Sequence, residues 1–120
     1  MKILVADDSR VMRQIVSRSL RQAGFSGHDV VEASNGQEAY DVVAAESPDL
    51  VLSDWNMPNM SGLECLEALR SAGSSVPFGF VTSEGSPEMR DKAAGAGALF
   101  LIAKPFNEDT FRDALEGVIS

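Results

Sequence analysis

Short apolar runs alternate with segments of helical periodicity along the whole of this chain. The apolar runs have the length of buried strands and predict five of them, at residues 2–6, 29–33, 50–54, 76–82 and 99–103. The segments between and after them predict five helices, at residues 9–23, 35–48, 61–73, 86–96 and 107–119. The fourth helix is rich in alanine and glycine, so we expect it to be the least stable.

Local signals support these boundaries. Asn35 with Glu38, and Ser61 with Glu64, have the spacing of a helix-starting capping box. In the first helix, the spacing predicts one inward-facing side made of Met12, Ile15, Val16, Ser19 and Leu20.

Strands that alternate with helices predict an α/β, doubly wound domain. Each crossover between parallel strands is right-handed and carries a helix, so the helices cover both faces of one parallel sheet. A chain of 120 residues fits a single domain, which we expect to span residues 1–120. Ligands of such domains bind at the carboxyl ends of the strands.

Charge and hydropathy exclude several classes of protein. The net charge of −8 argues against a nucleic-acid binder, because phosphate contacts depend on clustered Lys and Arg. No apolar run approaches the roughly 20 residues that a membrane helix needs. Met1 leads straight into the first strand without a secretory signal, so we expect a cytoplasmic protein.

Cys65 and His28 are the single cysteine and histidine of the chain. Cys65 lies in an apolar helical pattern, which predicts a small core residue instead of a reactive thiol. His28 lies at the amino end of the second strand, so we expect it at the surface and away from any catalytic group.

Charged residues stand where three of the apolar runs end. Asp7 and Asp8 close the first run, Asp54 closes the third, and Lys104 closes the fifth. An Asp before a helix is often only a cap, so each acid alone would be structural. Two adjacent acids that share one sheet edge with a third acid and a lysine favour a functional site. The pattern indicates a metal-dependent phosphoryl site.

Four dispersed elements together carry a family resemblance over the full length. These are Asp7-Asp8, the segment 54–62 (DWNMPNMSG), Thr82 and Lys104-Pro105-Phe106. In this order they resemble the response-regulator receiver family, single-domain chemotaxis (CheY-like) type. The resemblance implies a flavodoxin-like sheet with strand order 2-1-3-4-5 and a cis peptide bond between Lys104 and Pro105.

The resemblance also implies roles for single residues. Asp54 would be the nucleophile that accepts a phosphoryl group, and Lys104 and Thr82 would contact the phosphoryl oxygens. Mg²⁺ would be bound by Asp8 and Asp54 directly and by Asp7 largely through water. Asn56 would add its backbone carbonyl.

Further positions are expected to tune the site or its output. Ser9, Asn56 and Glu84 lie where an attacking water would enter, so they should set the lifetime of the phosphate, which we expect to be short. Leu101 stands where the chemotaxis type has a tyrosine, and leucine cannot make the phenolic hydrogen bond. We place Leu101 and Phe106 in the output surface formed by the fourth helix, fifth strand and fifth helix.

The partners follow from the same resemblance. The phosphodonor would be a CheA-like sensor histidine kinase or a small phosphodonor, and the reader a flagellar motor switch protein or a phosphatase. We expect a monomer without an output domain, without nucleic acid and without membrane insertion. The role would be chemotaxis signalling, or that of a phosphorelay shuttle or phosphate sink.

Two other classes share parts of this pattern. A flavodoxin-like mononucleotide binder would place a phosphate loop after the first strand, where Asp7 and Asp8 would repel a phosphate. A Mg²⁺-dependent aspartyl phosphohydrolase usually carries a second Asp two residues after its nucleophile, where this chain has Asn56. We therefore predict a phosphoacceptor switch that catalyses its own phosphorylation and dephosphorylation, and not an enzyme with a separate substrate.

Overall fold

The computed structural model describes residues 1–25 and 27–118. Its strands form one parallel sheet in the order β2-β1-β3-β4-β5. The strand bounds are β1 (Lys2–Ala6), β2 (Asp29–Ala33), β3 (Leu50–Ser53), β4 (Phe78–Thr82) and β5 (Phe100–Ala103). The predicted fold class and strand order are confirmed.

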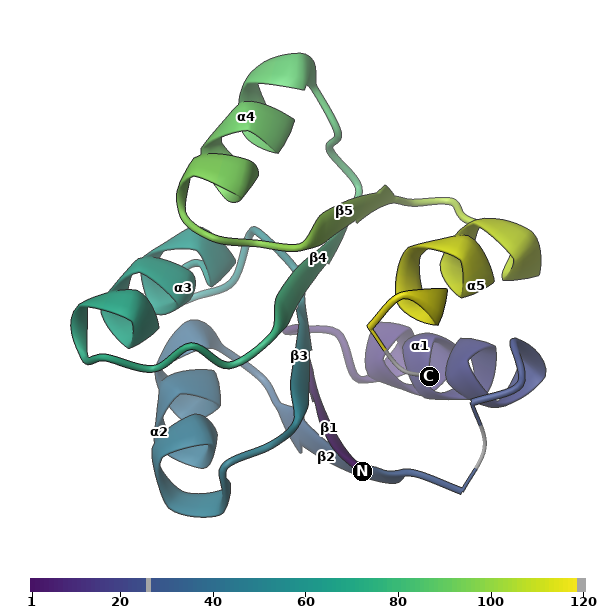
Figure 1. The fold of residues 1–120 in the computed structure, drawn as a ribbon, viewed down its shortest axis with the longest axis horizontal. Coiled ribbons are helices and arrows are strands. Elements are labelled where there is room, and N and C mark those ends of the chain that lie inside the picture. Colours follow the sequence, from purple (N-terminus) through teal and green to yellow (C-terminus); the bar gives the residue numbers. More distant parts are fainter. Residues whose placement is uncertain (26, 119–120) are drawn as a thin grey trace.

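Helices cover both faces of this sheet (Figure 1). Their bounds are α1 (Arg10–Gln22), α2 (Gly36–Glu46), α3 (Gly62–Ser71), α4 (Pro87–Gly95) and α5 (Glu108–Glu116). One core cluster joins the sheet to α1 and α5, and a second joins it to α2, α3 and α4. The domain is therefore a three-layer sandwich with a separate core on each side of the sheet.

Several boundaries differ from the sequence prediction. β3 ends at Ser53, and Asp54 follows the strand, although its N–H still donates to the Ala6 carbonyl at 2.8 Å. β4 begins at Phe78, two residues later than predicted, because Pro77 has no N–H to give to a ladder. α5 ends at Glu116, and the last predicted helical residue, Ile119, lies outside the described residues.

Each helix begins at a polar cap. The N-cap side chains accept a backbone hydrogen bond from the third residue that follows, and they are Ser9, Asn35, Ser61, Ser86 and Asn107. The capping box predicted at Ser61 is complete. The one predicted at Asn35 is only half formed, because the Glu38 carboxylate accepts from the N–H and hydroxyl of Ser34 instead.

Three residues show how well burial was predicted. Cys65 is fully buried in the core, and burial raises the pKa of its thiol to about 11, as expected for a structural cysteine. Ile15 was predicted to face inward but is 37% exposed. His28 was predicted at the surface, yet its ring Nδ1 is buried and has no hydrogen-bond partner among the described residues.

Gly62 supports the loop that carries Asp54. A Cβ at residue 62 would lie 2.1 Å from the Asp54 carbonyl oxygen, so the main chain itself would have to move. We expect Gly62→Ala to lower the free energy of unfolding by about 1–3 kcal/mol, the usual cost of overpacking. Urea denaturation measures this difference.

Gly95 offers a matched control for the same substitution. It lies in α4, and a Cβ there would meet nothing within 4 Å. Gly95→Ala should therefore raise the free energy of unfolding by about 0.5–1 kcal/mol. Equal effects of the two substitutions would contradict the close approach of α3 to the Asp54 loop.

Candidate functional site

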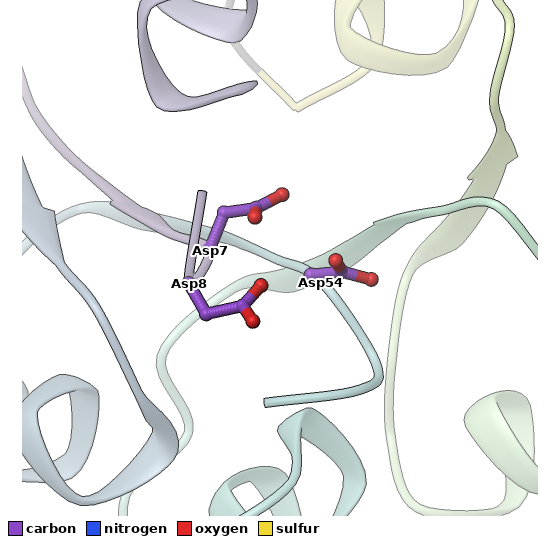
Figure 2. A group of neighbouring side chains, drawn as sticks. All are labelled: Asp7, Asp8 and Asp54. Atoms are coloured by element: carbon purple, nitrogen blue, oxygen red, sulfur yellow. The ribbon is translucent and has the colours of Figure 1, made fainter. Parts of the chain in front are cut away.

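Three carboxylates meet at the carboxyl ends of β1 and β3. Asp7 and Asp8 follow β1, and Asp54 follows the neighbouring strand β3. One carboxylate oxygen from each residue lies within 4.8 Å of the other two. Figure 2 shows Asp7 and Asp8 side by side on one segment, with their carboxylates on the side of Asp54. The predicted acidic cluster is therefore formed, and it could hold a metal ion.

Lys104 brings a positive charge to these acids. Its Nζ lies 3.0 Å from the Asp7 carboxylate and 3.4 Å from that of Asp54. Lys104 comes from the end of β5, and its N–H donates to the Thr82 carbonyl at the end of β4. The lysine side chain is 15% exposed, while those of Asp7 and Asp54 are 4% and 13% exposed, so the charges interact with little screening by water.

The main chain and α1 hold Asp7 in place. Its second carboxylate oxygen accepts from the Ser9 N–H at 2.9 Å, and its carbonyl accepts from the Arg13 guanidinium at 2.6 Å. Arg13 also pairs with Glu32 of β2 at 2.9 Å. The sequence analysis missed Arg13, although an arginine four residues after a helix cap can reach back over the preceding loop.

Asp54 is fixed by its own loop. One carboxylate oxygen accepts from the Trp55 N–H at 2.7 Å, and the Asp54 carbonyl accepts from the Ser53 hydroxyl at 2.8 Å. The Trp55 carbonyl accepts from the Gly62 N–H at the start of α3. The other carboxylate oxygen of Asp54 faces Lys104. These bonds orient the carboxylate toward the cluster.

The environment of Asp54 changes its acidity. Burial raises the pKa of its carboxyl above the ordinary value, Lys104 offsets part of that rise, and the charge of Asp7 adds to it. The charged form of Asp54 is consequently less stable in the folded protein than in the unfolded chain. Part of the folding energy is used to hold this carboxylate charged at neutral pH.

The remaining predicted residues lie around the acids. Thr82 is fully buried at the end of β4, and its hydroxyl accepts from the Glu84 N–H at 3.4 Å. Asn56 is exposed next to Asp8, where both line an open pocket of about 400 Å³. Glu84 is exposed, and the Ser9 hydroxyl accepts from the Met12 N–H as the cap of α1.

A second, apolar groove of about 440 Å³ begins at Lys104. Its lining comes from α1, from Ser83 after β4 and from the segment after β5, and it consists of Met12, Ile15, Ser19, Ser83, Lys104, Pro105 and Phe106. This groove explains why Ile15 is partly exposed. The Lys104–Pro105 bond is cis, as the resemblance implied.

Phe106 belongs to the α1 and α5 side of the sheet, stacked on Phe111 with ring centroids 5.2 Å apart. Leu101 packs with the opposite core, next to α4. Phe100 and Leu101 therefore lie on opposite faces of the sheet, as successive residues of a strand do. Leu101 and Phe106, which we assigned to one output surface, therefore pack on opposite faces of the sheet.

Comparison with known proteins agrees with this geometry. The sequence model described as "Response regulator receiver domain" matches residues 3–116. The chain belongs to the response-regulator receiver family. The receiver is 38% identical to the chemotaxis protein CheY homologs of three Campylobacter jejuni strains, over 99% of this chain and 92% of theirs.

Solved receiver structures have the same fold. Chemotaxis protein CheY4 of Vibrio cholerae superposes with a TM-score of 0.85 at 36% identity, covering 98% of both chains. The receiver domain of the response regulator NarL from Mycobacterium tuberculosis also gives 0.85, at 27% identity, covering 97% of this chain and 93% of that one. Among the described residues, no helix of the receiver is long and apolar enough to cross a membrane.

We predict that Asp54→Asn stabilises the metal-free receiver near neutral pH. The raised pKa means that ionisation of Asp54 opposes folding, and this cost grows as pH rises from the ordinary pKa through the raised one. Removing the charge should raise the melting temperature by about 4 °C at pH 7, on the order of 1 kcal/mol.

The same gain should shrink as the pH falls through the raised pKa and vanish below the ordinary Asp pKa of about 3.9, where the carboxyl is neutral in both the folded and the unfolded state. Thermal melts at several pH values measure both quantities. A loss of stability in Asp54→Asn at pH 7 would show that the Lys104 ion pair outweighs the burial and repulsion of the charge.

Proposed function

We propose that this receiver is a phosphorylation-controlled switch in which Asp54 accepts a phosphoryl group and a changed surface then binds a partner protein. The observation that carries the proposal is the Lys104 ammonium, 3.0 Å from Asp7 and 3.4 Å from Asp54, beside three clustered acids. A nucleophilic carboxylate must meet an anionic phosphoryl group here. The fixed cation lowers the energy of that encounter.

The donor set suits a Mg²⁺ ion. Carboxylate oxygens of Asp7, Asp8 and Asp54 gather within 4.8 Å, and Mg²⁺ prefers such hard oxygen ligands together with water. We assign Asp8 and Asp54 as direct ligands, Asp7 as a ligand through water, and the backbone carbonyl of Asn56 as a further ligand. The bound ion would neutralise charge between the carboxylate and the phosphoryl oxygens.

The transfer itself uses groups of this chain. A carboxylate oxygen of Asp54 attacks the phosphorus of a phosphohistidine, and the bond from phosphorus to the imidazole nitrogen breaks. Lys104 would turn from the carboxylates to a phosphoryl oxygen. The Thr82 hydroxyl accepts its present hydrogen bond from Glu84, so its own proton is free to donate to another phosphoryl oxygen. These donors favour the charged transition state.

The lifetime of the phosphate would depend on groups above the site. Asn56 and Glu84 are exposed, so both can orient or block a water that attacks phospho-Asp54. The Ser9 hydroxyl already caps α1, which leaves it less free to act on that water. We propose a short-lived phosphate and a protein that promotes its own phosphorylation and dephosphorylation.

The setting that we propose is chemotaxis in the cytoplasm, since the relatives at 36–38% identity carry chemotaxis names. The chain would act as a single receiver unit over residues 1–120, as a monomer, without binding nucleic acid. A CheA-like kinase would phosphorylate it, and a motor switch protein or a phosphatase would bind it. Phosphorylation-dependent binding of a motor-switch peptide would distinguish this role from that of a relay shuttle or phosphate sink.

We predict that acetyl phosphate with Mg²⁺ adds one labile phosphate to the native chain. Intact mass spectrometry at low temperature should show a gain of one phosphoryl group, about 80 Da, which disappears on incubation because an acyl phosphate hydrolyses. EDTA should abolish the adduct.

Two carboxamide variants sharpen this test. Asp54→Asn removes the nucleophile and should give no adduct, whereas Asp91→Asn, at an exposed position of α4, should react like the native chain. An adduct of equal size in Asp54→Asn would place the phosphate on another residue. Failure of the native chain both to form an adduct and to bind beryllofluoride would refute the proposed function.

A further inference from the structure

Arg90 of α4 joins the loop after β4 to strand β5. Its Nε donates to the Gly85 carbonyl at 3.2 Å, and one terminal nitrogen donates to the Leu101 carbonyl at 3.0 Å. Gly85 belongs to the loop between β4 and α4, and Leu101 belongs to β5. One guanidinium therefore ties the loop after Thr82 to the last strand of the sheet.

The Leu101 carbonyl belongs to β5, which is an edge strand of the sheet. β5 ends the strand order, so β4 is its one strand partner among the described residues. Main-chain groups at such an edge are open to other partners, and here the Arg90 side chain occupies one of them. Loss of the Arg90 bond would leave the Leu101 carbonyl open to another donor at this edge.

The other end of the link leads to Thr82. The Glu84 N–H donates to the Thr82 hydroxyl at 3.4 Å, and Gly85 follows directly. Space at Gly85 is restricted, since a Cβ there would lie 3.1 Å from the Ala103 side chain and 3.3 Å from the Arg90 guanidinium. A shift of Thr82 and its loop would displace the Gly85 carbonyl, which accepts from Arg90, relative to the guanidinium.

We propose that Arg90 is the positioning residue that couples the Thr82 loop to the β5 edge. The proposal rests on the function proposed above, because Thr82 would move toward a phosphoryl group on Asp54. Leu101 has no polar side-chain atom, so it is coupled to the Thr82 loop through its main-chain carbonyl and the Arg90 guanidinium. When the Gly85 carbonyl moves, the guanidinium can no longer donate to both carbonyls, and the Leu101 carbonyl is freed.

The released edge borders a pocket lined by α4 and β5. A shallow pocket of about 190 Å³ lies between α4 and β5, and Arg90, Ala94 and Leu99 are among the residues that line it. Leu99 is 57% exposed at its rim. Movement of the guanidinium changes both the shape and the charge of this pocket, which makes the link a route from the acids to a protein interface.

The chain contains a matched control for this link. Arg70 of α3 also bridges two main-chain carbonyls, those of Ser74 and Gly97, each at 3.1 Å. Gly97 precedes β5, so the Arg70 bridge lies at the amino ends of the strands, opposite to the acids. Loss of the Arg70 bridge removes a comparable structural contact without touching the Thr82 loop.

Hydrogen–deuterium exchange with and without Mg²⁺ and beryllofluoride tests the coupling. In the native chain the additive should change the exchange rate in the loop at residues 83–86 and speed exchange in β5, because β5 loses its bond to Arg90. In Arg90→Met and Arg90→Lys, the loop should still respond, while the response of β5 falls by about threefold or more, the size typical of coupling through such contacts. Arg70→Met should keep both responses.

The outcomes separate the two proposals. The Trp55 N–H donates to the Asp54 carboxylate, so the fluorescence of Trp55 is a second readout of binding at the site. If neither the native loop nor this fluorescence responds to beryllofluoride, the proposed function is wrong. If they respond, and β5 in Arg90→Met responds as it does in the native chain, the coupling through Arg90 is wrong. An equal loss of the β5 response in Arg70→Met would also overturn it, because any lost bridge would then have the same effect.

Discussion

Repulsion between carboxylates at one end of the sheet is the constraint on which the site depends. Asp7 and Asp54 are almost buried, so their two negative charges share a region with little water, and the exposed Asp8 adds a third charge next to them. Lys104 relieves part of this repulsion. The burial of the acids raises the pKa of Asp54 in spite of the lysine, which leaves a site that gains stability from another cation or from loss of a charge.

The parallel sheet is what brings these charges together. β1 and β3 are paired in register, Ala6 beside Ser53, so the residues that follow both strands must be neighbours. Lys104 crosses over the end of β4 from β5 to reach them. Small residues allow the close approach, since Gly62 lets α3 contact the Asp54 carbonyl. The fold thus places the strand ends next to one another, and the charged residues at those ends form the site.

The apolar pattern was sufficient to predict the parallel sheet and the cluster of Asp7, Asp8, Asp54 and Lys104, because the carboxyl ends of parallel strands lie at one edge of the sheet. The strand order came from the family resemblance. The sequence was not sufficient for Arg13 and Arg90. Arg13 reaches the Asp7 carbonyl and Arg90 the Leu101 carbonyl. The position of a long side chain in a helix shows that it can reach such a carbonyl, but not that it does. The partial exposure of Ile15 was missed for a similar reason, since the groove beside Phe106 depends on how α1 packs near the segment after β5.

The most direct test of the acid cluster is the melting temperature of the chain as a function of Mg²⁺ concentration. A ligand at tenfold excess over its dissociation constant stabilises the folded state by about 1.4 kcal/mol. We expect such a rise in the native chain and in the control Asp91→Asn, and its loss in Asp8→Asn and Asp54→Asn. An equal response in all four proteins, or none in the native chain, would contradict the view that these acids form a cation site.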